Sequence, residues 1–411
     1  MDQQRNGSDT GRLGPLLRHG RTLPLAIAVL AIGAAPQASG LTSAPATAQA
    51  QPASQLPAPP ASGVMGFVVN HFTFSVIQGK DACPGGPSPR NREIFVNSLP
   101  PAEAERLQKK ENEREFAQRW RATLMNPQGM NICNQYAHFP DRPLLKTVQS
   151  KFAWGLNLDG DAGDGSANPE GCAHENFTSP DGEKGIDNEA YRALGCKLEW
   201  RGIDGVQGDI VKGFEGFLLS GEWSQVILLR GVDSLVNDDN VEVVYANTQD
   251  RPVVDSAGKF IRYASFTTSD REGRFRNALR GRIVNGVLTT DSKDINLVYF
   301  PGQNVARVSF ELRKGKLRLA FQPDGSVKGI VGGYQPMENF QGHQARGGLG
   351  TAMTAGIDCA GEHNTLTKYA DGLRDPKTGK CTAISTALEL TAVPAFVNDL
   401  PAKSKPRVAS R

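Results

Sequence analysis

The chain has 411 residues, of which 46 are Lys or Arg and 43 are Asp or Glu, so its formal net charge is +3. Residues 1–50 contribute four Arg and two Asp, so the rest of the chain is nearly neutral, at about +1. Proteins that bind nucleic acid usually carry an excess of positive charge that attracts the phosphates. This chain has almost no such excess, which argues against a nucleic-acid partner.

The first 50 residues have the organisation of a secretory signal peptide. An arginine-containing start precedes the apolar run "LPLAIAVLAIGAA", and small residues then lead to Ala48-Gln49-Ala50, an A-x-A cleavage site. The alternative is a membrane anchor, but a spanning helix needs about 20 apolar residues and this run is shorter. We therefore predict residues 1–50 as a signal peptide, a periplasmic or secreted location, and no integral membrane span after cleavage.

Six cysteines follow the predicted cleavage site, and an even count in an exported chain predicts three disulfides. Six cysteines allow 15 connectivities, and the sequence does not choose among them. The simplest expectation pairs neighbours along the chain: 83–133, 172–196 and 359–381. The alternative for Cys359 is a metal site with His363, four residues further on.

Residues 51–62, rich in Pro and Ala, are predicted to be a linker because they have no apolar face to bury. Residues 63–150 form an N-terminal region that begins with a strand or strand pair rich in Val, Phe, Thr and Ile. Its clearest helix is "SLPPAEAERLQKKENEREFAQRWRATLM", with Ser98 as the cap and two prolines in the first turn. One apolar stripe of this helix is predicted to dock it: Phe116, Trp120 and Leu124.

Short strands separated by turn residues fill residues 213–342. Asn285-Gly286 lies between β-branched residues, which is the strongest short hairpin pattern, and "PDG" at 323–325 indicates a second hairpin. In "KLRLAF" apolar and basic residues alternate, so one face of that strand is buried. Such spacing is typical of an antiparallel sandwich or barrel. We predict a mainly β fold, an antiparallel β-sandwich with a few peripheral helices and disulfide-stapled loops.

The C-terminal segment, residues 343–411, is rich in Gly and Ala. We expect a short helix at "EHNTLTKYADGL", a final strand at "ISTALELTAV" and a frayed basic tail.

Residues 151–212 form an Asp-rich cassette. Three aspartates, Asp159, Asp161 and Asp164, alternate with glycines, and such a loop can turn several carboxylates towards a cation. If Asp159 is taken as the first residue of an EF-hand loop, Glu170 is the twelfth residue. Position six is Asp164, where an EF-hand needs glycine, so a true EF-hand is excluded and a looser Asp/Asn/Gly loop around a cation remains.

A second acidic group, "PDGEKGIDNE", follows at residues 180–189. In this group, the alternative to metal binding for Asp187 is to cap the short helix "NEAYRALG", in which Tyr191 and Leu194 would face inward. We predict a calcium (Ca2+) site, because calcium takes six to eight oxygen ligands. The predicted ligands are the following: Asp159, Asp161, Asp164, Glu170, Asp181, Asp187 and Asn188.

The alternative for the cassette is ordinary turn chemistry, since Asp, Asn and Gly are the commonest turn formers. The expected bridge between Cys172 and Cys196 favours the metal, because it would bring the two acidic groups together. Converging carboxylates repel each other unless a cation neutralises them.

The run "LNLDGD…GIDNEAYRALGC…GVDSLVNDDNVEV…GRIVNGVLTT" resembles a group of uncharacterised exported bacterial proteins with an Asp-rich G-x-D-N cassette followed by a β-sandwich. The resemblance spans about residues 150–340 and implies no activity. In this chain Asp181-Gly182 and Asp187-Asn188 are separated by extra residues, so the metal-binding repeat pattern is interrupted.

Catalysis has one candidate centre, His174 with Glu175 inside the cassette, since a histidine near carboxylates can act as a base. The chain has no H-E-x-x-H, C-x-x-C-H or G-x-S-x-G pattern. We predict an exported binding or structural module with a glycan, an envelope component or another secreted protein as its partner. The alternatives are a metal-assisted hydrolase that uses the Asp cassette and His174 on the same scaffold, and a periplasmic assembly factor.

Overall fold

The computed structural model describes residues 52, 55–163, 170–203, 206, 208–268, 273–298 and 309–400, apart from the side chains at 80 and 343–346. The predicted signal peptide at 1–50, the candidate ligand Asp164 and the basic tail from 401 lie outside the described residues.

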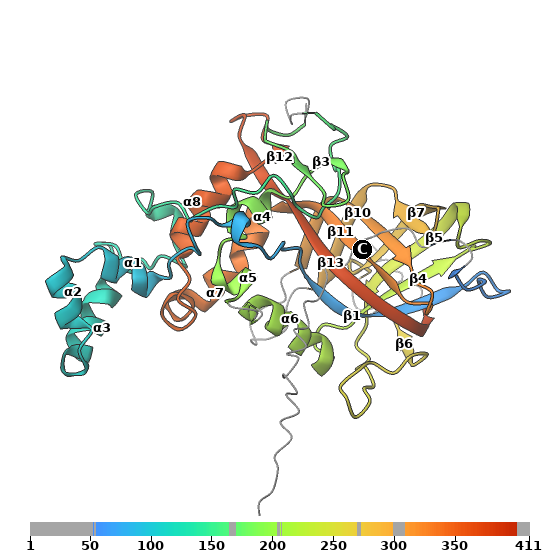
Figure 1. Ribbon diagram of the computed structural model, residues 1–411, viewed down its shortest axis with the longest axis horizontal. Helices are drawn as coiled ribbons and strands as arrows, with labels where there is room; N and C mark the ends of the chain where they lie inside the picture. The colour runs from blue at the N-terminus through green and yellow to red at the C-terminus, as the bar shows by residue number, and fades with distance from the viewer. Residues whose placement is uncertain are drawn as a thin grey trace, which may run out of the picture. The chain divides into compact units, whose positions relative to one another are not determined.

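Eight antiparallel strands form a closed barrel (Figure 1). Each strand pairs with the next one along the path, and β1 also pairs with the last strand, β13, so that Gly66 has Leu228 on one side and Ala395 on the other. The predicted β-sandwich is therefore wrong, although the mainly β class is correct. The barrel strands are β1 (Met65–Phe74), β4 (Gln225–Arg230), β5 (Asn237–Asn247), β7 (Arg276–Val284), β8 (Val287–Thr290), β10 (Ser309–Phe321), β11 (Val327–Pro336) and β13 (Cys381–Asn398).

Three further strands extend the sheet beyond the barrel. β6 (Ser265–Thr267) runs parallel to β13, β12 (Gly372–Arg374) pairs with the start of β13, and β9 (Lys293–Val298) pairs with β10. A separate two-stranded sheet joins β2 (Phe177–Thr178) to β3 (Lys184–Ile186).

Side chains that alternate along the strands fill the inside of the barrel with a single hydrophobic core. In β10, for example, Leu317, Leu319 and Phe321 are buried in this core, as the alternation in the sequence predicts. Aromatic rings pack edge to face at its centre, with Phe72 5.1 Å from Trp223 between ring centroids.

Both predicted hairpins are confirmed. β7 and β8 are joined by Asn285 and Gly286, whose φ angles are 50° and 82°, as a type I′ turn requires. The turn at 323–325 joins β10 to β11, with Gly325 at φ 80°.

The helices lie on one side of the barrel in Figure 1. Trp200, Phe214 and Phe340, from α5, α6 and α7, surround Phe74 and join the barrel core where β1 ends.

No helix in the described part of the chain is long and apolar enough to cross a membrane. The α-helices are α1 (Asn91–Asn97), α2 (Pro101–Leu107), α3 (Glu113–Ala122), α4 (Glu189–Leu194), α5 (Leu198–Arg201), α6 (Asp209–Ser220), α7 (Met337–Thr354) and α8 (Cys359–Tyr369), with 3-10 turns η2 (Lys80–Ala82), η3 (Lys110–Asn112) and η4 (Tyr136–His138).

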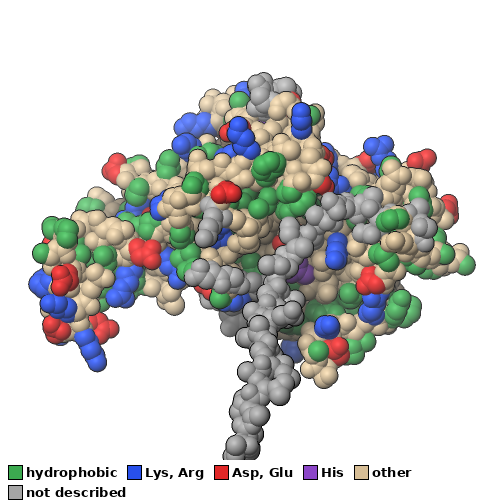
Figure 2. All heavy atoms as spheres, in the orientation of Figure 1, with side chains coloured by type: hydrophobic (Ala, Val, Ile, Leu, Met, Phe, Trp, Pro, Cys, Tyr) green, Lys and Arg blue, Asp and Glu red, His purple; other side chains and the backbone are tan. Residues whose placement is uncertain are grey.

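The single helix predicted from Ser98 is divided into α2, η3 and α3, and Ser98 ends α1 instead of capping α2. The apolar stripe of Phe116, Trp120 and Leu124 is buried, as predicted, in a second core. Figure 2 shows charges of both signs over α2 and α3, and their side chains form ion pairs such as Arg106 with Glu115.

The three disulfides are confirmed, but the expected neighbour pairing is wrong. The bonds join Cys83 to Cys196, Cys133 to Cys359 and Cys172 to Cys381, so each one links segments more than 100 residues apart. The Cys133–Cys359 bond lies in the second core and holds the helical segment around α3 to α8. Cys359 is therefore a half-cystine and does not bind metal with His363.

One histidine makes the stability of the barrel depend on pH. His71 in β1 lies between Glu215 of α6 and Glu389 of β13, with nitrogen–oxygen distances of 3.5 and 3.9 Å. Burial lowers the pKa of His71, but the two carboxylates raise it more, to about 9 from 6.5. The imidazolium thus stabilises the fold fully below pH 6.5, and this contribution is lost as pH rises through 9.

We expect the free energy of unfolding to fall by roughly 1 kcal/mol between pH 6.5 and 9.5 through His71, because its side chain is 26% exposed and solvent screens the pair. Urea unfolding at both pH values measures this loss, and the variant His71→Gln should reduce it. An equal loss in the wild type and in His71→Gln would contradict the assignment.

Candidate metal centre

Three side chains from separate segments meet outside the barrel: Asp159, His174 and Asp187. Each offers one ligand atom, and these atoms all lie within 4.8 Å of one another. The segment 154–158 brings Asp159 to this place, because its apolar residues pack on β11 and β13. Asp187 lies two residues before the start of α4, and His174 follows the half-cystine Cys172 by two residues.

Asp187 organises the cluster and is only 1% exposed. Its Oδ2 accepts hydrogen bonds from the backbone N–H groups of Leu158 (2.7 Å) and Asp159 (3.3 Å). Its Oδ1 lies 2.8 Å from Nε2 of His174. The carboxylate therefore connects the loop that carries Asp159 with the loop that carries His174.

A close approach between the two acidic loops depends on Gly185 in β3. Its φ is 76°, in the left-handed region, and a Cβ at this position would collide with the backbone oxygen of Asp161. The glycine-rich composition of the cassette thus has a structural reason at this residue.

The two ring nitrogens of His174 have different partners. Nδ1 lies 3.1 Å from the carbonyl oxygen of Cys172, and a carbonyl only accepts, so Nδ1 carries a proton. In the neutral ring, Nε2 would then point a lone pair at the Asp187 carboxylate. At 2.8 Å, Nε2 and the carboxylate oxygen are at hydrogen-bond distance, so a proton lies between them. A cation bound by both atoms would hold them roughly 3 Å apart or more, so it would need the two side chains to separate slightly.

With a proton there, His174 is an imidazolium. Burial lowers the pKa of His174, but the hydrogen bond to Asp187 and the negative charge of Asp371 raise it to about 10. With a cation there, the proton on Nδ1 and the Cys172 carbonyl match the outer-shell hydrogen bond that orients metal-binding histidines.

Two carboxylate oxygens, one in the triad and one next to it, are buried without a hydrogen-bond partner among the described residues. One is Oδ2 of Asp159, whose Oδ1 accepts from the Asp161 N–H (2.8 Å). The other is Oδ2 of Asp371, whose Oδ1 accepts from the Ser385 N–H (2.7 Å). Burial raises the pKa of Asp159, and it raises that of Asp371 to about 7.

The cluster therefore has an excess of negative charge when its carboxyls are ionised. Asp159, Asp187 and Asp371 face one imidazole, and the nearby Glu189 is paired with Arg192. A divalent ion would offset this excess and satisfy the unpartnered oxygens. The triad supplies two carboxylates and one imidazole, which leaves coordination positions for water or a substrate.

Of the seven ligands predicted from sequence, the structure brings Asp159 and Asp187 together in the triad. Asp164 lies outside the described residues. Glu170 forms an exposed ion pair with Lys314, and Asp181 accepts a hydrogen bond from the Ser179 hydroxyl at the surface. Neither of these two reaches the cluster.

The remaining two predicted ligands organise the backbone around the site. Oδ1 of Asp161 accepts from the Gly163 N–H (2.7 Å) and closes a turn. Asn188, and not Asp187, caps α4 by accepting from the Tyr191 N–H, and its Nδ2 donates to the Trp154 carbonyl (2.8 Å). Tyr191 and Leu194 are fully buried, as predicted.

Two residues of the cluster were outside the predicted ligand set. His174 was considered only for catalysis, although a histidine between two acidic groups could have indicated a nitrogen ligand. Asp371 had no local pattern to identify it, because it reaches the site through β12 and the Cys172 N–H, which donates to its carbonyl (2.8 Å).

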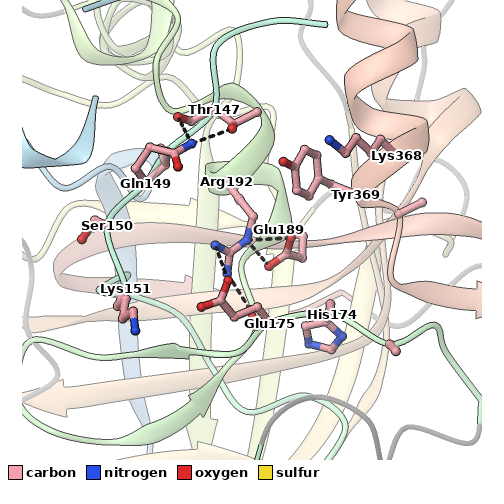
Figure 3. Close-up of a pocket in the computed structure, with 13 residues that line it drawn as sticks. Thr147, Gln149, Ser150, Lys151, His174, Glu175, Glu189, Arg192, Lys368 and Tyr369 are labelled. Carbon is pink, nitrogen blue, oxygen red and sulfur yellow. Dashed lines mark hydrogen bonds and ion pairs between the residues drawn. The ribbon is translucent and has the colours of Figure 1, made fainter. Parts of the chain in front are cut away.

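Two cavities flank the triad. A cavity of about 470 Å³ is lined by His174, Glu189 and Arg192 among others (Figure 3). A smaller one, of about 280 Å³, is lined by Asp159 and Lys314. Both cavities are open to solvent, so an ion or a small polar molecule has a path to either side of the cluster.

No protein-family model matches this chain, and neither the curated proteins nor the solved structures give a match to it. The resemblance to exported bacterial proteins thus stays a prediction, and the case for function rests on the geometry of the Asp159–His174–Asp187 centre.

Proposed function

We propose that this is an exported binding module whose Asp159–His174–Asp187 centre holds a divalent metal ion as a structural brace. One observation carries the proposal: ligand atoms of Asp159, His174 and Asp187 all lie within 4.8 Å of one another, and Oδ2 of Asp159 is buried without a hydrogen-bond partner among the described residues. An ion between these groups would connect the acidic loops to each other and, through segment 154–158, to the outside of the barrel.

The donor set favours a transition ion over the calcium expected from sequence. Calcium sites use oxygen ligands only, whereas an imidazole nitrogen with two carboxylates is typical of zinc, manganese or iron sites. We propose zinc as the first candidate, because it is bound by four ligands and the triad supplies three of them.

Export is supported by two independent features. Residues 1–50 have the pattern of a cleavable leader, and the described cysteines all form disulfides, which persist in oxidising compartments. The partner class remains the one expected from the sequence, a glycan, an envelope component or another secreted protein.

A metal-assisted hydrolase is the second candidate, and the larger cavity favours it. His174 lines this cavity together with Glu189, so a water on the ion could face a substrate there. The variant His174→Ala should then abolish turnover of a glycoside or ester substrate while the barrel stays folded. A native metal-loaded protein without turnover on a panel of such substrates supports the structural role instead.

Metal analysis tests the proposed function directly. We expect elemental analysis of the purified native protein to find about one transition ion per chain, and EDTA to release it. If the ion is present at about a hundred times its dissociation constant, it stabilises the fold by about 2.7 kcal/mol. The unfolding entropy of a folded chain of about 350 residues is about 0.7 kcal/mol/K, so removal of the ion should lower Tm by roughly 4 °C.

Readdition of zinc should restore Tm in this experiment, whereas calcium should restore less of it. A native protein that contains no divalent ion, and whose Tm responds neither to EDTA nor to added zinc, would overturn the proposal. The centre would then be an imidazolium–carboxylate pair.

A further inference from the structure

The larger cavity beside the metal centre has the composition of a ligand site. Its volume is about 470 Å³, within the range of small-molecule pockets. Figure 3 shows Glu189 and Arg192 between Lys151 on one side and Lys368 with Tyr369 on the other.

The buried charges at the centre of the cavity are already paired. Nε of Arg192 donates to both carboxylate oxygens of Glu189, at 2.8 and 2.9 Å. The guanidinium also stacks on the ring of Phe177 at 3.9 Å, so its position is fixed. A bound molecule therefore meets a rigid, neutralised pair at this point.

The two lysines are not paired in this way. Lys151 and Lys368 are both exposed, and within the described part of the chain neither forms an ion pair with a carboxylate; Nζ of Lys368 lies over the Tyr369 ring, 5.3 Å from its centroid. Glu175 also lines the cavity, but its carboxylate is 69% exposed and lies 3.8 Å from Arg192. Apart from His174 of the metal centre, the lining thus carries three cationic side chains against two carboxylates, which favours an anion.

The uncharged side chains that line the cavity indicate which other chemical groups the bound anion has. Thr147, Ser150 and Tyr369 offer hydroxyl groups, and the Tyr369 ring forms part of the wall. Hydroxyl groups beside one aromatic ring suit a molecule with several hydroxyls and an apolar C–H face. A sugar that carries a carboxylate has these features and fits the volume as one or two residues.

We propose that this cavity binds the acidic sugar residue of a glycan, with its carboxylate held by Lys368 beside Tyr369 and with Lys151 adding a second positive charge on the opposite side of the cavity. This assignment rests on the proposed binding role and names its ligand class. It does not need the ion as a contact, because the lysines, the hydroxyls and Tyr369 make the recognition.

Titration calorimetry on the full native protein tests the assignment with galacturonic acid and its dimer as probes. We expect both to bind, and galactose, which has the same ring without the carboxylate, to bind at least tenfold more weakly. The double variant Lys151→Ala/Lys368→Ala should weaken the acid at least tenfold, with metal content and Tm unchanged. As a matched control, Lys109→Ala/Lys110→Ala removes two exposed lysines of the α2–η3 region and should leave binding unchanged.

Several outcomes would overturn the assignment. Equal affinity for galactose and galacturonic acid removes the role of the carboxylate, and equal affinity for inorganic phosphate makes the cavity a simple anion site. If the protein contains the ion but binds none of the probes, the assignment of the ligand is wrong and the proposal of a metal centre is unaffected. Failure of the metal centre shows instead in elemental analysis, which does not involve the sugar.

Discussion

The variant Asp187→Asn is expected to lose the metal ion and to lower the free energy of unfolding by about 3–5 kcal/mol. The substitution removes the charge that faces His174, and it weakens the acceptor for the Leu158 and Asp159 N–H groups. Without the carboxylate, the buried imidazolium or ion loses its closest counter-charge. Urea unfolding measures the stability, and elemental analysis measures the ion.

Asp181→Asn is the matched control for this prediction. Asp181 belongs to the same acidic cassette, but it is exposed, and among the described residues it forms a hydrogen bond only with nearby Ser179. Its substitution should change stability by less than about 0.5 kcal/mol and retain the ion. If Asp181→Asn released the ion as fully as Asp187→Asn, the Asp159–His174–Asp187 centre would be the wrong site.

The double variant Cys172→Ser/Cys381→Ser is expected to destabilise the fold by about 2–5 kcal/mol and also to weaken metal binding. The disulfide ties the His174 loop to the first residue of β13, beside the backbone hydrogen bond from Cys172 to Asp371. Loss of this tie lets Nε2 of His174 move away from Asp187. Zinc affinity, measured by competition with a chelator at a temperature where the variant is folded, reports the effect.

The disulfide between Cys133 and Cys359 provides a control of nearly the same loop size, with a sequence separation of 226 against 209. Its removal should cost a similar free energy, because the loop entropy is similar, but it should leave zinc affinity unchanged. Equal loss of zinc affinity in both double variants would mean that the ion depends on overall stability and not on the position of His174.

Local patterns predicted the strands and turns of the barrel well, because alternation and turn chemistry depend on neighbouring residues. The Asn285-Gly286 hairpin follows from the need for positive φ at two residues, and the buried face of "KLRLAF" follows from the period of a strand. The same alternation occurs in sandwiches and barrels. Pairing of β1 with β13, from opposite ends of the described chain, decided between them.

The long helix predicted from Ser98 shows a different limit. Helix-forming composition extends across residues 108–112, but the chain makes the short η3 turn there before α3 begins. The resulting bend lets α2 and α3 both bury apolar side chains, such as Leu107 and Phe116, in one core. Burial of two faces decided the break, and intrinsic propensity did not.

The acidic cassette was identifiable from the sequence, whereas the composition of its centre was not. Asp159 and Asp187 stood out by their spacing, but five similar oxygen-bearing side chains stood out equally. In the structure Glu170 and Asp181 are separated from Asp187 by their exposure, whereas Asn188 is as buried as Asp187 and differs from it because its side chain caps α4.

By itself the sequence determined a leader-like start, an even set of half-cystines, a run of antiparallel strands and an acidic loop, because each depends on composition or on short spacing. Only the tertiary structure decided the closure of the barrel, the partner of each cysteine and the meeting of His174 and Asp371 with the two aspartates. Contacts between distant segments depend on which surfaces fit together when they are buried, and no local period encodes that fit.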